Sequence, residues 1–122
     1  MTTPPHRESP IFVRTYDWLR WLLPLTLQFP KSQRFLMAQR LQEKSLAFYD
    51  HLVAAGRRVE VAENLQQADV LLEQIRLNVR LCRDLNLMQP RQYEHAARLL
   101  DEIGRLLGGW QAKQKKGGGS SE

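Results

Sequence analysis

Apolar residues recur along the chain at alternating steps of three and four, the spacing that places them on one face of an α-helix. The alternation of apolar and polar residues that marks a half-buried strand does not occur in these segments. The pattern therefore predicts an all-α protein. The expected helices cover residues 11–28, 32–55, 59–85 and 90–112.

Each of the four helices is expected to bury an apolar seam typical of helices that pack nearly parallel to one another. Short connections join all four, which predicts an up-down-up-down four-helix bundle. Cys82 falls in the third seam and is expected to be a small core residue. The seams are Ala38, Leu41, Ser45, Phe48, Leu52 and Ala55 in the second helix, Val61, Leu65, Ala68, Leu72, Ile75, Val79 and Cys82 in the third, and Tyr93, Ala96, Leu100, Ile103, Leu107 and Trp110 in the fourth.

Helix ends are indicated by proline, glycine and serine. Pro24 is expected to bend the first helix, which ends at Phe29–Pro30. Ser32 is a suitable N-cap for the second helix and Gly56 a suitable C-terminal stop. Pro90 suits the first position of the fourth helix.

The two ends of the chain differ in composition from the bundle. Residues 1–10 are rich in proline and predict a disordered tail, whereas residues 11–112 form the bundle. Residues 113–122 run from lysines into glycine and serine, which predicts a flexible basic tail. Within the fourth helix, Gly108–Gly109 are expected to weaken the last turn.

Composition excludes several classes of protein. A chain of 122 residues is one domain's worth of sequence, and one cysteine with three scattered histidines gives neither a disulfide nor a metal site. The longest apolar stretch, Trp18–Leu27, is interrupted by Arg20 and Pro24 and is too short to span a membrane. Phosphate-loop, nucleophile-elbow and zinc-protease motifs are absent. We therefore expect a cytoplasmic protein that is not an enzyme and has no cofactor, metal or small-molecule substrate.

The first helix is more apolar than one seam requires. A surplus of this kind on a helix surface predicts contact with a partner or with a second copy of the chain. The residues expected to line the core are Leu19, Leu22, Leu23 and Thr26. Those expected on the outer surface, as an oligomer interface, are Trp18, Trp21 and Leu25.

Positive charge is the other conspicuous feature. The formal net charge is +5, and arginine supplies thirteen of the eighteen basic residues. Arginine suits phosphate contacts and protein interfaces because its planar guanidinium is weakly hydrated and donates several hydrogen bonds. The candidates for binding nucleic acid or a partner are Arg76, Arg80 and Arg83 on the third helix, Arg91, Arg98 and Arg105 on the fourth, and Lys113, Lys115 and Lys116 beyond it.

The arginine pattern has two interpretations, which the spacing leaves open. Arg76, Arg80 and Arg83 fall within about 60° of one helix face, and the fourth-helix arginines recur every seven residues. Such stripes suit sequence-independent contacts to phosphates. Equally, pairs such as Glu94–Arg98 and Asp101–Arg105 stand in the order that stabilises a solvated helix surface.

Two segments resemble a known family: YDWLRWLLPLTLQFPKSQRF at Tyr16–Phe35 and PRQYEHAARLLDEIGRLLGGW at Pro90–Trp110. They resemble the small four-helix-bundle proteins related to Avd, the accessory variability determinant of diversity-generating retroelements. The spaced arginines of LLEQIRLNVRLCRDLNL, residues 71–87, belong to the same resemblance, which extends from about Tyr16 to Lys116. One departure is Gln89, which stands where the family often has a serine or threonine cap.

The resemblance implies a homopentamer of four-helix protomers that binds a retroelement reverse transcriptase. It also implies contact with RNA or an RNA/DNA hybrid during mutagenic copying of a template repeat. Carried over by position, partner binding falls on Arg76, Arg80 and Arg105. Arg91, Arg98 and Arg34 are further candidates.

The same fold family includes proteins encoded within intervening sequences of large-subunit ribosomal RNA genes. An oligomeric structural protein that binds no nucleic acid is therefore the alternative, since a fold alone does not determine function.

Overall fold

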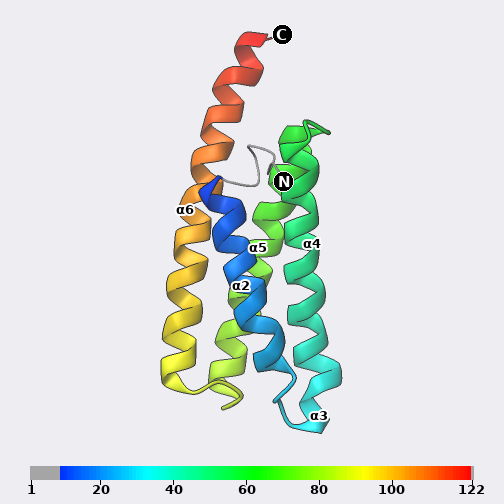
Figure 1. Cartoon of the computed structure of the whole chain (residues 1–122), viewed down its shortest axis with the longest axis vertical. Helices are drawn as coiled ribbons and strands as arrows, with labels where there is room; N and C mark the ends of the chain where they lie inside the picture. Colours follow the sequence, from blue (N-terminus) through cyan, green and yellow to red (C-terminus); the bar gives the residue numbers. More distant parts are fainter. Residues whose placement is uncertain (1–8, 122) are drawn as a thin grey trace, which may run out of the picture.

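The computed structural model describes residues 9–121, with the side chains of residues 9–117, and it is an all-α bundle (Figure 1). Residues 1–8 of the predicted N-terminal tail lie outside the described part. No strand occurs between residues 9 and 121, so the predicted fold class is confirmed. The elements are α2 (Pro10–Thr26), α3 (Lys31–Gln33), the short π-helix η1 (Arg34–Ala38), α4 (Gln39–Gly56), α5 (Val61–Asp84) and α6 (Pro90–Ser121).

The four long helices form a ring in which each packs against two neighbours. Helix α6 lies between α5 and α2, and α4 completes the ring between α2 and α5. Because short connections link successive helices, neighbours in sequence run in opposite directions (Figure 1). Segments α3 and η1 lead directly into α4 at the end of the bundle where α2 stops.

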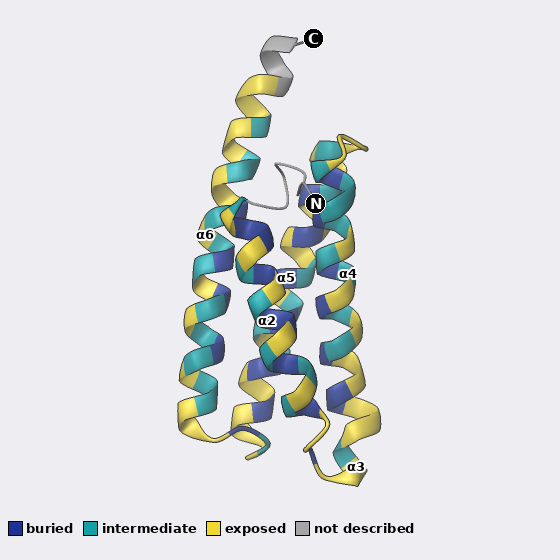
Figure 2. Cartoon of the chain, in the orientation of Figure 1, coloured by how far each residue is buried: buried dark blue, intermediate teal, exposed yellow. Residues whose placement is uncertain are grey.

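The predicted seams form the core. Buried positions line the inward sides of the helices, and exposed positions lie outside (Figure 2). Every predicted seam residue of η1 and α4 is buried, as are those of α5 apart from the half-buried Val61. In α6 the seam is buried except at Tyr93 and Trp110, which are half-buried at its two ends.

The seam of α2 differs from the prediction. Trp18 is 1% exposed, and its indole Nε1 donates a hydrogen bond to Ser45 Oγ on α4 at 2.9 Å. It follows Ile11 and Thr15 and precedes Leu22 along one buried face. Its assignment to an oligomer interface is therefore wrong, because the indole fills the core and satisfies its one donor there.

Helix starts also differ from the prediction. Pro30, rather than Ser32, is the N-cap of the segment that leads into α4; Ser32 lies within the first turn. The Pro30 carbonyl accepts from the N–H groups of Gln33 and Arg34 at 2.8 and 3.1 Å. At α6, Pro90 is the first residue as predicted, and Gln92 Oε1 accepts from the N–H of Gln89 at 2.9 Å, which supplies half of a capping box.

A left-handed residue ends α4, but it is not Gly56. Arg58 has φ 68°, and the N–H groups of Arg58 and Val59 donate to the carbonyls of Ala55 and Ala54 at 3.0 and 2.9 Å. This double bond is the Schellman motif, whose left-handed position is usually glycine. Gly56 instead remains the last residue of the helix.

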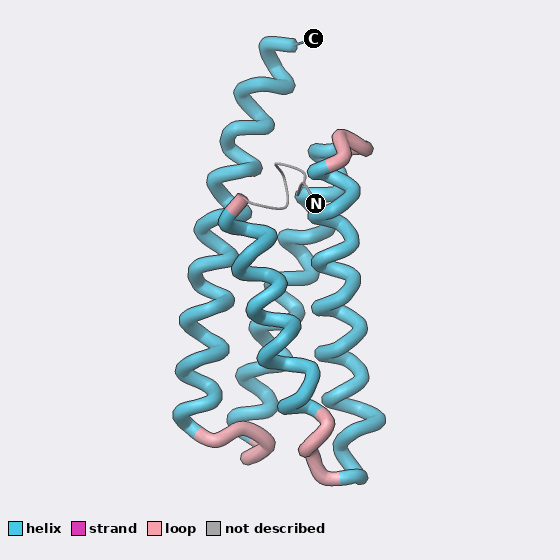
Figure 3. Tube along the Cα trace, in the orientation of Figure 1, coloured by secondary structure: helices cyan, strands magenta, loops and turns pink. Residues whose placement is uncertain are grey.

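The segment predicted as a flexible tail is helical as far as Ser121. Helix α6 continues through Gly108 and Gly109 without a break (Figure 3) and extends past the end of the bundle. Two glycines lower helix propensity, but residues 110–116 that follow contain no proline and include alanine, glutamine and lysine, which favour helix. Pro10 likewise belongs to α2 rather than to a tail.

Candidate nucleic-acid interface

A polar groove of about 360 Å³ lies between α5 and α6 on the surface of the bundle, and two of the predicted arginines line it. Arg76 spans this groove: its Nη1 donates to Asp101 Oδ1 at 3.0 Å and its Nη2 donates to the Leu100 carbonyl at 3.2 Å. The second bond joins the α5 side chain directly to the backbone of α6, because its acceptor is a carbonyl in the middle of that helix. Arg76 is thus a link between two helices, and its charge is already paired.

Gly104 makes room for this link. A Cβ atom at position 104 would lie 2.3 Å from Arg76 Nη2, well inside contact distance. The guanidinium therefore occupies the space that a side chain would need. This explains why α6 keeps a residue of low helix propensity in its interior.

A double-mutant cycle tests the link between Arg76 and Gly104. Arg76→Ala is expected to lower the free energy of unfolding by about 1 kcal/mol in the wild-type background, from the loss of a half-exposed ion pair and one hydrogen bond. In a Gly104→Ala background the same change is expected to cost under about 0.3 kcal/mol, because the added methyl has already displaced the guanidinium. Urea unfolding of the four proteins measures the coupling, and equal costs in both backgrounds would contradict it.

Arg83 is also held at the α5–α6 contact. Its Nε donates to Asp84 Oδ1 at 3.0 Å, and its guanidinium carbon lies 4.5 Å from the centre of the Tyr93 ring on α6. A cation over an aromatic face is attracted by the ring's electrons. Two of the three arginines in the predicted α5 stripe are therefore engaged within the chain.

The other four of the six predicted α5 and α6 arginines are exposed, and no hydrogen bond or ion pair is found for them among residues 9–117: Arg80, Arg91, Arg98 and Arg105. We call these four the outer arginine face. The predicted pairs Glu94–Arg98 and Asp101–Arg105 do not form within this part of the chain, and Asp101 pairs with Arg76 on α5 instead. Arg80 and Ala97 both line the α5–α6 groove.

The outer arginine face has a regular spacing. Seven helical residues rise about 10.5 Å, so the three α6 arginines cover about 21 Å along the helix. Lys113, Lys115 and Lys116 are exposed farther along the same helix.

The other flank of α6 is neutralised. Glu102 accepts from Arg14 Nε at 3.0 Å, and Asp17 accepts from Arg14 Nη1 at 2.6 Å. The hydrogen bonds to Glu102 and then Asp17 raise the pKa of Arg14 above its ordinary value. His95 packs against Trp21, with ring centres 4.9 Å apart. Arg14 thus neutralises Glu102 on this flank of α6, whereas the outer arginine face carries unpaired positive charge.

A family model described as bAvd-like matches residues 11–114, which is most of the chain. The chain belongs to the bAvd-like family. The matched segment contains all six predicted α5 and α6 arginines and Lys113, and it ends before Lys115 and Lys116. Comparison with curated proteins gives no match.

The cysteine of this bAvd-like chain is a core residue. Burial raises the pKa of the Cys82 thiol to about 11, so it is protonated at neutral pH and serves as a core residue. Residues 9–121 contain no cluster of three side chains suited to holding a metal. None of the helices in this part of the chain has the length and apolar character needed to cross a membrane.

The predicted oligomer residues lie inward, and other apolar residues are exposed instead. Trp21 and Leu25 are half-buried and pack against the core. Sequence reasoning missed the outer side of α5, where Val70, Leu77 and Leu81 are 45–52% exposed at steps of seven and four. That spacing marks a helix face suited to packing, and it is the feature of the sequence from which this surface could have been predicted.

Arg34, the remaining candidate for partner binding, donates from Nε to the Phe29 carbonyl at 3.2 Å.

Proposed function

We propose that this bAvd-like chain is an accessory protein of a diversity-generating retroelement. It associates with the element's reverse transcriptase and with template RNA or an RNA/DNA hybrid. The observation that carries the proposal is the family match over residues 11–114. The outer arginine face supports it, because exposed arginines without acidic partners are available to phosphates.

The accessory role is one of binding, and the polymerase performs the chemistry. Arginines at intervals of about 10.5 Å contact phosphates of one strand and release counterions, which gives affinity without reading bases. The chain would thereby hold the template near the polymerase. Affinity for nucleic acid should fall steeply as salt rises.

Fluorescence anisotropy of labelled RNA and of an RNA/DNA hybrid tests nucleic-acid binding. The expected result is binding at 50 mM salt that weakens by at least tenfold at 200 mM. Absence of binding to both probes at 20 mM salt would remove nucleic acid from the proposal. A reverse-transcriptase gene beside the chain's own gene, with template and variable repeats, would independently favour the role.

We further propose that the chain assembles as a homopentamer through the outer side of α5. Five chains of 14.3 kDa total about 72 kDa. Replacing Leu77 and Leu81 with glutamate is expected to reduce the native mass measured by light scattering, because it places charge in an apolar helix contact. Glutamate at Val13 and Tyr16, which are also exposed, serves as the control and should leave the mass unchanged. A reduced mass in the control alone would contradict the α5 assignment.

A structural oligomer without nucleic-acid binding is the second candidate. It is favoured by the arginines already paired within the chain, namely Arg14, Arg76 and Arg83. This candidate predicts an oligomeric mass but no salt-dependent binding of RNA. The anisotropy experiment therefore separates the two.

A further inference from the structure

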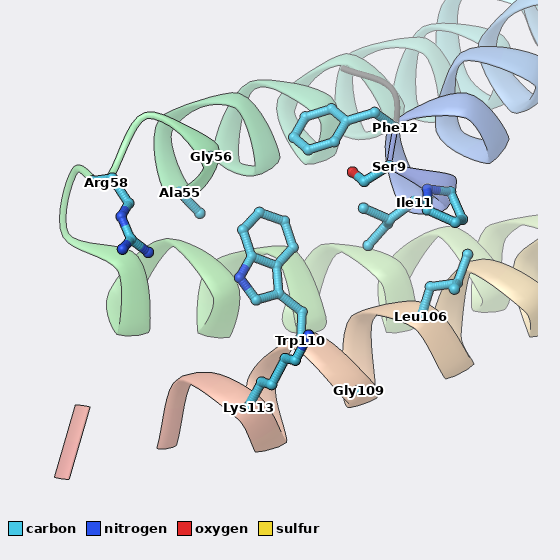
Figure 4. A pocket seen from close by; sticks show the side chains of 11 residues that line it. Ser9, Ile11, Phe12, Ala55, Gly56, Arg58, Leu106, Gly109, Trp110 and Lys113 are labelled. Carbon is cyan, nitrogen blue, oxygen red and sulfur yellow. The ribbon is translucent and has the colours of Figure 1, made fainter. Parts of the chain in front are cut away.

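An apolar pocket of about 560 Å³ lies at the end of the bundle from which α6 extends (Figure 4). Three helices contribute to it: the start of α2, the end of α4, and α6 near Trp110. We call it the end pocket. It is separate from the α5–α6 groove, and none of its lining residues belongs to the outer arginine face. The lining residues are Ser9, Pro10, Ile11, Phe12, Ala55, Gly56, Arg58, Leu106, Gly109, Trp110 and Lys113.

Aromatic rings form one side of the end pocket. The indole of Trp110 projects from α6 toward the end of α4, with Phe12 of α2 beside it (Figure 4). Their ring centres are 6.0 Å apart and tilted by 55°, and Phe12 also meets Tyr49 edge-on at 6.3 Å. Trp110 is only half-buried. Gly109 adds no side chain, and a Cβ there would meet nothing within 4 Å, so the approach beside the indole is open.

The charged residues of the end pocket are both cations, Arg58 and Lys113. Beyond them, Lys115 and Lys116 continue the positive charge along α6, and residues 103–117 contain no acidic residue. Apolar aromatic surface beside a row of cations matches a strand that has flat bases and a charged backbone. A small apolar ligand with one carboxylate would neutralise only one of the cations beside the end pocket.

Arg58 gives a second reason to expect an anionic ligand. It stands in the left-handed position of the Schellman motif, with φ 68°. Glycine adopts this conformation without strain, whereas a residue with a Cβ is destabilised in it. The arginine therefore occupies a position where glycine would be more stable, and its guanidinium reaches the end pocket (Figure 4).

From this arrangement we infer that the end pocket receives an unpaired base of a single-stranded nucleic acid. The base stacks on Trp110, while Arg58 and Lys113 contact the flanking phosphates. The inference rests on the proposed nucleic-acid binding and adds a contact that depends on bases, which the outer arginine face does not provide.

Two single-stranded probes with equal backbone charge test the stacking contact: a strand of twelve deoxythymidine nucleotides and an abasic strand of the same length. One stacked base is expected to favour the first probe by roughly 5- to 150-fold, since stacking contributes about 1–3 kcal/mol per base. Anisotropy at fixed salt gives both affinities. Equal affinity for the two probes would overturn the inference.

Variants locate the contact. Trp110→Ala should abolish the preference for the base-containing strand while the affinity for the abasic strand stays within twofold. Trp110→Phe should retain part of the preference and guards against a folding defect in the alanine variant. A preference that survives unchanged in both variants would place stacking elsewhere and overturn the inference.

Arg58→Gly separates stability from binding. It should raise Tm by about 4 °C, because glycine relieves the left-handed strain, yet reduce the salt slope for the deoxythymidine strand by about 0.7. Lys31→Gln, at the opposite end of the bundle, should change neither. An unchanged slope in Arg58→Gly would remove its phosphate contact.

The failures of the two proposals are distinguishable. If loss of Arg91, Arg98 and Arg105 weakens RNA binding but the two twelve-residue probes bind equally, the end-pocket inference fails and the proposed function stands. If neither strand nor RNA binds at 20 mM salt, both fail.

Discussion

Replacing Trp18 with alanine is expected to lower the free energy of unfolding by about 3–5 kcal/mol, as for large aromatic residues removed from cores. Trp18 is 1% exposed and is the largest fully buried side chain of the bundle. Its loss leaves a cavity between α2 and α4 and leaves Ser45 Oγ without its donor. Since folded domains are only marginally stable, this change removes a large part of the total. Urea unfolding monitored by circular dichroism measures it.

Two smaller changes separate the packing of Trp18 from its hydrogen bond. Ser45→Ala should cost about 1–3 kcal/mol, because the buried indole N–H then has no acceptor. Trp21→Ala should cost less than Trp18→Ala, because Trp21 is only half-buried. If Trp18→Ala instead left stability unchanged and lowered the native mass, Trp18 would face another subunit and its placement in the core would be contradicted.

Removing the α6 arginines is expected to have the largest effect on nucleic-acid binding. In the triple variant Arg91→Gln, Arg98→Gln, Arg105→Gln, the slope of log affinity against log salt should fall in magnitude by about 2–3, since each lost phosphate contact contributes about 0.7–0.9. Glutamine preserves helix propensity, so the fold should persist. Anisotropy of labelled RNA across a salt series measures the slope.

A charge-matched control distinguishes the outer arginine face from net charge. The changes Arg20→Gln, Lys31→Gln and Arg40→Gln also remove three exposed cations, and both triples lower the formal net charge from +5 to +2. Only the α6 triple should reduce the slope by the full amount. Equal reductions would mean that binding follows overall charge rather than this face.

Periodicity predicted the bundle because burial of one stripe per helix dominates its energetics. The seams of α4, α5 and α6 could be read directly, since their apolar and polar positions are well separated. In α2 the apolar residues cover more than one face. The pattern therefore assigns both Trp18 and Trp21 to the outer surface, although Trp18 is buried in the core. The end of α4 is less predictable from sequence, because Arg58 adopts a left-handed backbone conformation that its residue type disfavours.

The candidate site was predicted by residue but not by role. The positions of Arg76, Arg80 and Arg83 on one α5 face follow from helix geometry. Their partners do not, because Asp101, Leu100 and Tyr93 lie on another helix and within-helix spacing favoured Arg105 as the partner of Asp101. The end pocket is formed by parts of three helices that are distant in sequence, and no local pattern specifies how they come together.

The most direct test of the proposed function is the mass of a complex with the reverse transcriptase of the same retroelement. The tagged chain is coexpressed with that enzyme and its template RNA, then analysed by size-exclusion chromatography with light scattering. The account predicts one co-eluting species that contains both proteins and RNA. It also predicts that the α6 triple variant loses RNA from this species, while the charge-matched control retains it. Elution of the chain at its own oligomeric mass, apart from the enzyme and RNA at 50 mM salt, would contradict the account.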